Sequence, residues 1–93
     1  MSPELEKASA LPRPVTLLAF AAAQDLVGHA QAEFALEREV SVAAFWELLV
    51  AAYPALSPHR GGLRLAVNGT YAFDQDMIGY GDEVALIPPV SGG

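Results

Sequence analysis

The chain of 93 residues has no cysteine, and Lys7 is the single lysine among its 5 basic residues. Without cysteine, disulfides, thiolate nucleophiles and cysteine-ligated zinc sites are excluded. Charged residues make up only 17% of the chain, against about 25% in an average soluble domain. The longest apolar runs fall well short of the roughly 20 residues that a membrane-spanning helix needs. We therefore expect neither cysteine chemistry nor a membrane partner.

What the chain does have is apolar surface and negative charge. It is 53% hydrophobic, with a mean hydropathy of +0.31. This is more apolar surface than the core of one small domain hides, which indicates a protein partner. The net charge of −6 argues against nucleic acid as a partner. Residues 1–14 hold three prolines and mixed charge and lack the features of a signal peptide. We expect residues 1–13 to be a flexible leader and the protein to be cytoplasmic.

The first half of the chain predicts two strands and a helix. A β-rich run predicts the first strand in residues 14–21, and moderate alternation predicts the second in residues 32–39. The segment between them, residues 22–28, suits a helical turn that glycine ends. Ser41 is a predicted N-cap for a helix over residues 42–53. The apolar residues at helical spacing are Val42, Phe45, Leu48, Leu49 and Ala52.

The second half predicts shorter strands separated by turns. We expect a loop in residues 57–62, a strand in residues 63–69 that ends at an Asn-Gly turn, and a short returning strand in residues 70–73. Residues 74–82 are predicted as loop. The last strand covers residues 83–87, and Pro88 and Pro89 end it.

This order of elements predicts an α+β fold. If the first and last strands lie side by side and parallel, a mixed sheet of about five strands results, with one main helix packed on one face. That arrangement is the β-grasp, or ubiquitin-like, fold. We expect one domain over residues 14–89 and a flexible C-terminal Gly-Gly tail over residues 90–93.

Alternation along the strands predicts an apolar patch on the sheet face that the helix leaves open. The predicted outward residues are Thr16, Leu18, Phe20, Arg64, Ala66, Asn68, Glu83, Ala85 and Ile87, with Tyr71 at the edge. A single exposed apolar side chain is ordinary. A patch that continues across several strands favours a protein interface.

No pattern of polar side chains predicts an active site or a metal site. The two histidines are isolated, the Asp-x-Asp pair lacks the glycine and glutamate of a calcium loop, and Gly-Tyr-Gly is not followed by the residues of a phosphate loop. The serines have no histidine and aspartate partners in view. The residues considered are His29, His59, Asp74, Asp76, Gly79, Gly81, Ser57 and Ser91.

The C-terminus offers the chemistry that the side chains lack. Two consecutive glycines end a chain by chance about once in 200. The two prolines stiffen the exit from the sheet, and Gly92 and Gly93 make a thin arm that can enter a narrow channel of another protein. A carboxylate is a poor electrophile. Joined to AMP, it becomes a mixed anhydride that a sulfur or nitrogen nucleophile attacks.

Three stretches resemble the small subunits of molybdopterin synthase. They are "AVNG" at residues 66–69, "GDEVALIPPV" at residues 81–90 and the terminal "SGG". "FAAAQDLVG" at residues 20–28 is similar to the family's segment after the first strand. The resemblance covers about residues 14–93 and implies a ubiquitin-like sulfur carrier with no bound cofactor.

The resemblance implies a reaction at the terminal residue, here Gly93. A ubiquitin-activating-like adenylyltransferase adenylates Gly93 with ATP, and the adenylate is then converted to a thiocarboxylate. The tail enters the large subunit of the synthase and supplies sulfur to cyclic pyranopterin monophosphate. Two small and two large subunits form a heterotetramer. The resemblance makes Gly92 and Gly93 the catalytic residues. The residues that it places in partner contacts are Phe20, Tyr71, Ile87, Pro88, Pro89, Val90 and Ser91.

The chain departs from the family's pattern at Gln24, where a basic residue is common, and at Tyr80, where aspartate is common. Both are expected in partner-facing loops. Three other functions stay open: a sulfur carrier for thiamine or cysteine synthesis, a ubiquitin-like protein modifier that acylates lysines, and an inert β-grasp binding module. Removing Gly93 separates the last of these from the others, since a binding module would keep its activity.

Overall fold

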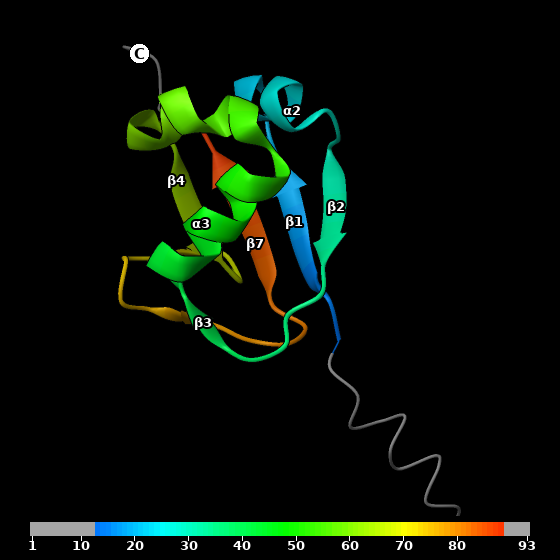
Figure 1. Ribbon diagram of the computed structural model, residues 1–93, viewed down its shortest axis with the longest axis vertical. Helices are drawn as coiled ribbons and strands as arrows, with labels where there is room; N and C mark the ends of the chain where they lie inside the picture. The colour runs from blue at the N-terminus through cyan, green and yellow to red at the C-terminus, as the bar shows by residue number, and fades with distance from the viewer. Residues whose placement is uncertain (1–12, 89–93) are drawn as a thin grey trace, which may run out of the picture.

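The computed structural model of the protein describes residues 13–88. A five-stranded sheet forms one layer, and helix α3 (Val42–Ala52) packs across one of its faces (Figure 1). The strand order is β2-β1-β7-β4-β5. The strands are β1 (Val15–Ala19), β2 (Gln31–Phe34), β4 (Arg64–Val67), β5 (Thr70–Tyr71) and β7 (Glu83–Ile87). The predicted α+β sandwich with a mixed sheet is confirmed.

The two central strands are parallel, as the sequence predicts. In β1 and β7, Leu17 lies beside Val84 and Leu18 beside Ala85. The outer neighbours, β2 and β4, run antiparallel to them. Parallel strands cannot be joined by a tight turn, because the chain must return to the same end of the sheet. Here α3 lies on the path between them.

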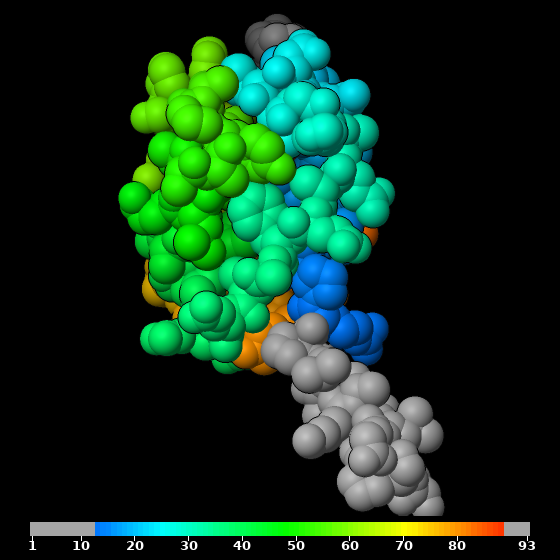
Figure 2. All heavy atoms as spheres, turned by 45° about the vertical axis from the view of Figure 1, so that its right-hand side comes forward, coloured from blue at the N-terminus to red at the C-terminus, as the bar shows by residue number. Residues whose placement is uncertain are grey.

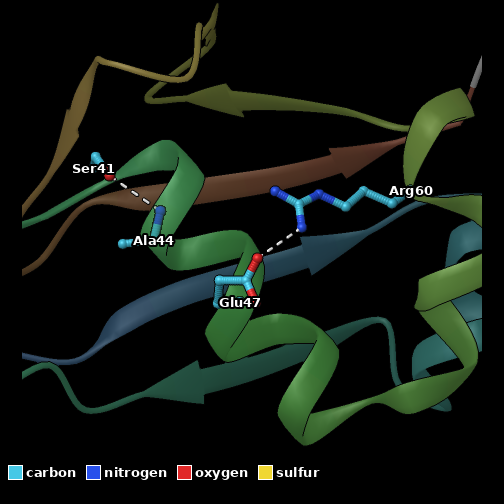
Figure 3. Close-up of polar contacts among 4 residues, drawn as sticks. All are labelled: Ser41, Ala44, Glu47 and Arg60. Carbon is cyan, nitrogen blue, oxygen red and sulfur yellow. Dashed lines mark hydrogen bonds and ion pairs between the residues drawn. The ribbon is translucent and has the colours of Figure 1, made fainter.

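Helix α3 begins at its predicted cap. The Ser41 Oγ accepts a hydrogen bond from the Ala44 N–H at 3.0 Å (Figure 3), which satisfies one of the free N–H groups of the first turn. The buried residues are Val42, Phe45, Trp46 and Leu49. The spacing also assigned Leu48 and Ala52 to this face, and that prediction is wrong: both are exposed. The buried face of α3 includes Trp46 next to Phe45. Leu48 and Ala52 therefore lie on the side of the helix away from the sheet.

The core lies between the sheet and the helical layer. Phe45 and Leu49 of α3 meet Val15, Leu17 and the inward side chains of β7, all at 2% exposure or less. Figure 2 shows the helical side of the molecule, where the green atoms of α3 and the yellow-green atoms of the segment after it lie beside the cyan atoms of α2 (Ala22–Val27) and β2. Within residues 13–88, no helix combines the length and the apolar character needed to cross a membrane.

The segment predicted as a loop at residues 57–62 belongs to a 3-10 helix, η1 (Pro54–Gly62). Pro54 suits a first helical position because a free N–H there has no helical acceptor. The Leu56 N–H donates to the Tyr53 carbonyl at 2.9 Å, and the Leu56 side chain is fully buried. This single apolar anchor holds a proline- and glycine-rich segment against the core.

Two further predictions are corrected. The strand expected at residues 32–39 ends at Phe34, and the chain then turns so that Leu36 enters the core. The loop expected at residues 74–82 contains β6 (Met77–Ile78), which pairs antiparallel with β3 (Val40–Ser41). Pairs of two-residue strands leave no periodicity to read. Residues 1–12 of the predicted leader, Pro89 and the tail lie outside the described residues.

Candidate functional site

The sheet face opposite α3 is open and apolar. Phe20 follows β1 and is 50% exposed, Tyr71 on β5 is 48% exposed, and Ile87 at the end of β7 is half-buried. The three side chains line one hollow of about 370 Å³. The structure thus brings together the three residues that the family resemblance places in apolar partner contacts. We call this surface the open face: Leu18, Phe20, Ala66, Tyr71, Ala85 and Ile87.

Strand register explains why the open face is hollow. Leu18 lies beside Ala85, Ala85 beside Ala66, and Ala66 beside Tyr71, so the four residues form one row across four strands. Two alanines in the middle of the row leave a depression, and larger side chains flank it. Ala66 is 5% exposed but lies outside the core cluster under α3. It points outward, as predicted, and its neighbours cover it.

Charged groups stand at both ends of this hollow. The guanidinium carbon of Arg64 lies 4.3 Å from the centre of the Tyr71 ring, within the range of a cation–π interaction. Arg64 is opposite Ile87 in the register of β4 and β7, so it marks the end of the face from which the chain continues to its tail. Glu83 lines the hollow from the other end of β7.

The family-like motifs "AVNG" and "GDEV" are joined by hydrogen bonds. The Asn68 Nδ2 donates to Asp82 Oδ1 at 3.0 Å, and the Glu83 N–H donates to Asn68 Oδ1 at 3.0 Å. A second carboxylate oxygen, Asp82 Oδ2, accepts from the Gly79 N–H at 2.8 Å. Asn68 and Gly69 both have positive φ, 52° and 87°, as a type I′ hairpin turn requires. These motif residues therefore hold the turn after β4 against the start of β7.

The other polar residues singled out in the sequence do not converge. His29, His59 and Ser57 are exposed. The Asp76 carboxylate accepts the Phe73 N–H at 2.8 Å and so closes a local turn. Over the part of the chain that is described, no three histidine, aspartate or glutamate side chains gather as a metal site would need.

The two departures from the family's pattern lie in different surroundings. Gln24 is exposed on helix α2 rather than in a loop, which corrects the expectation. Tyr80 precedes β7, and its hydroxyl donates to the Glu37 carbonyl at 2.6 Å. Tyr80 thus fastens the segment after β2 to the segment before β7, at the end of the sheet away from the tail.

The base of the tail lies at the end of β7. Pro88 is half-buried and lines a second hollow, of about 540 Å³, between α2 and η1. Its other walls include Leu26, Pro58 and Leu63. Pro89, Val90, Ser91, Gly92 and Gly93 lie outside the described residues, so the roles expected of them stay predictions.

Helix α3 across a five-stranded mixed sheet, with the first and last strands parallel at its centre, defines a ubiquitin-like β-grasp protein. The ThiS family matches residues 17–93, and the chain belongs to that family.

Curated relatives agree with the resemblance noted in the sequence. The chain is 32% identical over 79 residues to the molybdopterin synthase sulfur carrier subunit of Arabidopsis thaliana, an alignment that covers 85% of this chain and 82% of the relative. It is 35% identical over 82 residues to the subunit of the same name from Drosophila yakuba, with 85% and 90% covered. The similarity to small subunits of molybdopterin synthase is thereby confirmed.

Solved structures share the fold. SAMP1 from Haloferax volcanii matches with a TM-score of 0.74 and 28% identity, over 86% of this chain and 99% of that one. A putative molybdopterin converting factor, subunit 1, from Pyrococcus furiosus matches with a TM-score of 0.75 and 23% identity, over 84% and 99%. The second likeness supports the fold alone.

Proposed function

We propose that the protein is the sulfur carrier subunit of a molybdopterin synthase. The observation that carries the proposal is the 32% and 35% identity to curated sulfur carrier subunits over 85% of the chain. The Gly-Gly end, five residues beyond Pro88, supports it. The reaction is centred on the main-chain carboxyl of Gly93, the group that the family resemblance makes reactive.

The proposed chemistry has two steps. A ubiquitin-activating-like adenylyltransferase joins the Gly93 carboxylate to AMP from ATP, with release of pyrophosphate. Hydrosulfide from a sulfur source then attacks the carbonyl carbon and displaces AMP, which leaves a thiocarboxylate on Gly93. In the synthase, the thiocarboxylate donates its sulfur to cyclic pyranopterin monophosphate. This chain binds no cofactor of its own in this scheme.

The folded domain has the task of delivering the terminus. The open face docks on the large subunit of the synthase, with Phe20, Tyr71 and Ile87 as the apolar contacts. Five residues beyond Pro88 reach at most about 17 Å when fully extended, so Gly93 arrives in the partner's active site only if β7 ends close to its entrance. Two small and two large subunits form the proposed heterotetramer, in the cytoplasm.

The first test is intact-mass spectrometry after incubation with ATP, the activating enzyme and a sulfur source. We expect one oxygen to be replaced by sulfur, and fragmentation to place the change at Gly93. Fragmentation is needed because oxidation of Met1 or Met77 changes the mass almost equally.

The matched control lacks Gly92 and Gly93. It is expected to fold and to bind the large subunit, and to carry no sulfur. An unmodified Gly93 in the full chain, with an activating enzyme shown to work on another carrier, would contradict the proposal.

A ubiquitin-like protein modifier is the second candidate function. The 28% identity to SAMP1 favours it. A second structure from the same organism carries the name small archaeal modifier protein 1. The same activated Gly93 serves both functions, because a deprotonated lysine amine and a sulfur nucleophile both attack an acyl-adenylate. Sulfur carriers for thiamine or cysteine synthesis share the fold and the terminus, but the curated relatives favour molybdopterin.

A further inference from the structure

Two arginines of the domain stack on aromatic rings, and they differ in one respect. Arg60 lies 5.3 Å from the Trp46 ring and also donates to the Glu47 carboxylate at 3.0 Å (Figure 3). Arg64 lies over Tyr71 at 4.3 Å. Within residues 13–88, Arg60–Glu47 is the single ion pair. Arg64 therefore has the aromatic support but no described carboxylate.

The position of Arg64 makes this difference significant. It is exposed, faces Ile87 across β4 and β7, and stacks on a residue of the open face. Any protein that covers the open face also removes water from the Arg64 guanidinium. An arginine stays charged at every physiological pH, and burying an unpaired charge is strongly unfavourable. A docked partner must therefore supply an acceptor at this point.

We propose that Arg64 determines partner specificity on the open face by pairing with a carboxylate of the large subunit. The inference rests on the proposed docking of that face. A guanidinium held over the Tyr71 ring has lost part of its rotational freedom, and its N–H fork matches the planar, bidentate geometry of a carboxylate. The chain carries a net charge of −6, so acids elsewhere on a partner approach a protein that is acidic on balance. One acid at one position thus sets both the orientation of the complex and the choice of partner.

This pair also positions the tail. Arg64 lies beside the last residue of β7, one residue before Pro88. A partner contact at Arg64 therefore holds in place the point at which the chain leaves the sheet. A contact at Glu83, at the other end of the same strand, would leave the exit free to pivot.

The test measures binding of the purified large subunit by isothermal titration. We expect Arg64→Gln to weaken binding on the order of 10-fold and Arg64→Glu to weaken it at least about 100-fold, because the second change opposes two like charges. Arg64→Lys keeps the charge without the fork and is expected to fall between the parent chain and Arg64→Gln. The matched control is Arg60→Gln, an arginine on an aromatic ring outside the open face. It is expected to change binding by less than about 2-fold. Thermal unfolding of each variant confirms that it folds.

A charge exchange completes the experiment. Aspartates and glutamates of the large subunit are changed to lysine one at a time, and one of them is expected to restore binding to Arg64→Glu. The absence of any such residue would overturn the carboxylate pair. Phe20→Asp tests the docking face itself. If Phe20→Asp weakens binding and the Arg64 variants do not, the inference fails and the docking proposal stands; if none weakens binding, the docking proposal fails.

Discussion

At the scale of single residues, Asn68 illustrates how a motif residue serves the fold. Its N–H donates to the Glu83 carbonyl at 2.7 Å, its Oδ1 accepts the Glu83 N–H, and its Nδ2 binds Asp82. Its φ of 52° lies in the left-handed region, where asparagine and glycine are tolerated and alanine is strained. One side chain thus connects the β4–β5 turn to the strand that leads to the tail.

Two substitutions separate these contributions. Asn68→Gly keeps the backbone conformation and removes the side-chain hydrogen bonds, so we expect the free energy of unfolding to fall by about 1–2 kcal/mol. Asn68→Ala also adds backbone strain, so we expect a further loss of about 1 kcal/mol. Urea unfolding measures both. Equal losses in the two variants would show that backbone strain contributes nothing, and no loss in either would refute the hydrogen-bonded link.

At the scale of elements, the sequence predicts those whose own periodicity or caps define them. A β-rich run predicts the first strand over residues 14–21, where β1 covers residues 15–19. The last strand is observed at its predicted bounds, residues 83–87, and Ser41 caps its helix as predicted. The pairing of β3 with β6 is different, because each strand has two residues and the partners are far apart in the chain. Contacts of that kind arise from packing of the whole domain and leave no local signal.

The helix η1 escapes sequence-based prediction for a different reason, and it supports a prediction about stability. Proline and glycine are usually loop residues, and only the burial of Leu56, at 0% exposure, shows that η1 is part of the core. Leu56→Ala should lower the free energy of unfolding by about 2–4 kcal/mol, because it removes a large buried side chain and leaves a cavity. Denaturant unfolding measures the change.

The control for that change is Leu48→Ala, the same substitution at a position 41% exposed. We expect it to alter stability by less than about 1 kcal/mol. Comparable losses in the two variants would mean that η1 does not rest on Leu56. They would also restore Leu48 to the buried face that helical spacing assigned to it.

At the scale of the whole molecule, the distribution of basic residues bears on the two candidate functions. Lys7 is the single lysine, and the other basic residues are Arg13, Arg38, Arg60 and Arg64. A guanidinium stays protonated and does not attack an acyl-adenylate, whereas an amine does. Residues 13–88 therefore present no side-chain amine to an activated Gly93 of another copy.

We expect Lys7→Arg to form the Gly93 thiocarboxylate to the same extent as the parent chain. We expect any self-linked product of the parent chain to disappear in this variant, apart from one joined through the N-terminal amine. Denaturing electrophoresis and fragment mass spectrometry distinguish these cases. A variant that fails to acquire sulfur would mean that Lys7 takes part in recognition by the activating enzyme.

The sequence predicts part of the candidate site, and there is a physical reason why it does not predict the rest. Strand alternation is a local property, so the sequence alone is enough to turn Phe20 and Ile87 outward. The importance of Arg64 is not visible there, because it depends on Tyr71 lying under its guanidinium and on the lack of a described carboxylate nearby. Both facts concern neighbours in space across β4 and β5, which alternation along one strand does not report.

The parallel pairing of β1 and β7 has a practical consequence for handling the protein. Because both central strands run in the same direction, Arg13 precedes one end of the sheet and Pro88 follows the other, separated by a strand of five residues, or about 16 Å. A surface or an affinity handle attached ahead of β1 therefore leaves the opposite pole facing the solution. A handle ahead of β1 keeps clear of the end at which Pro88 leads to the tail, which makes the protein suitable as a bait for partners that bind there.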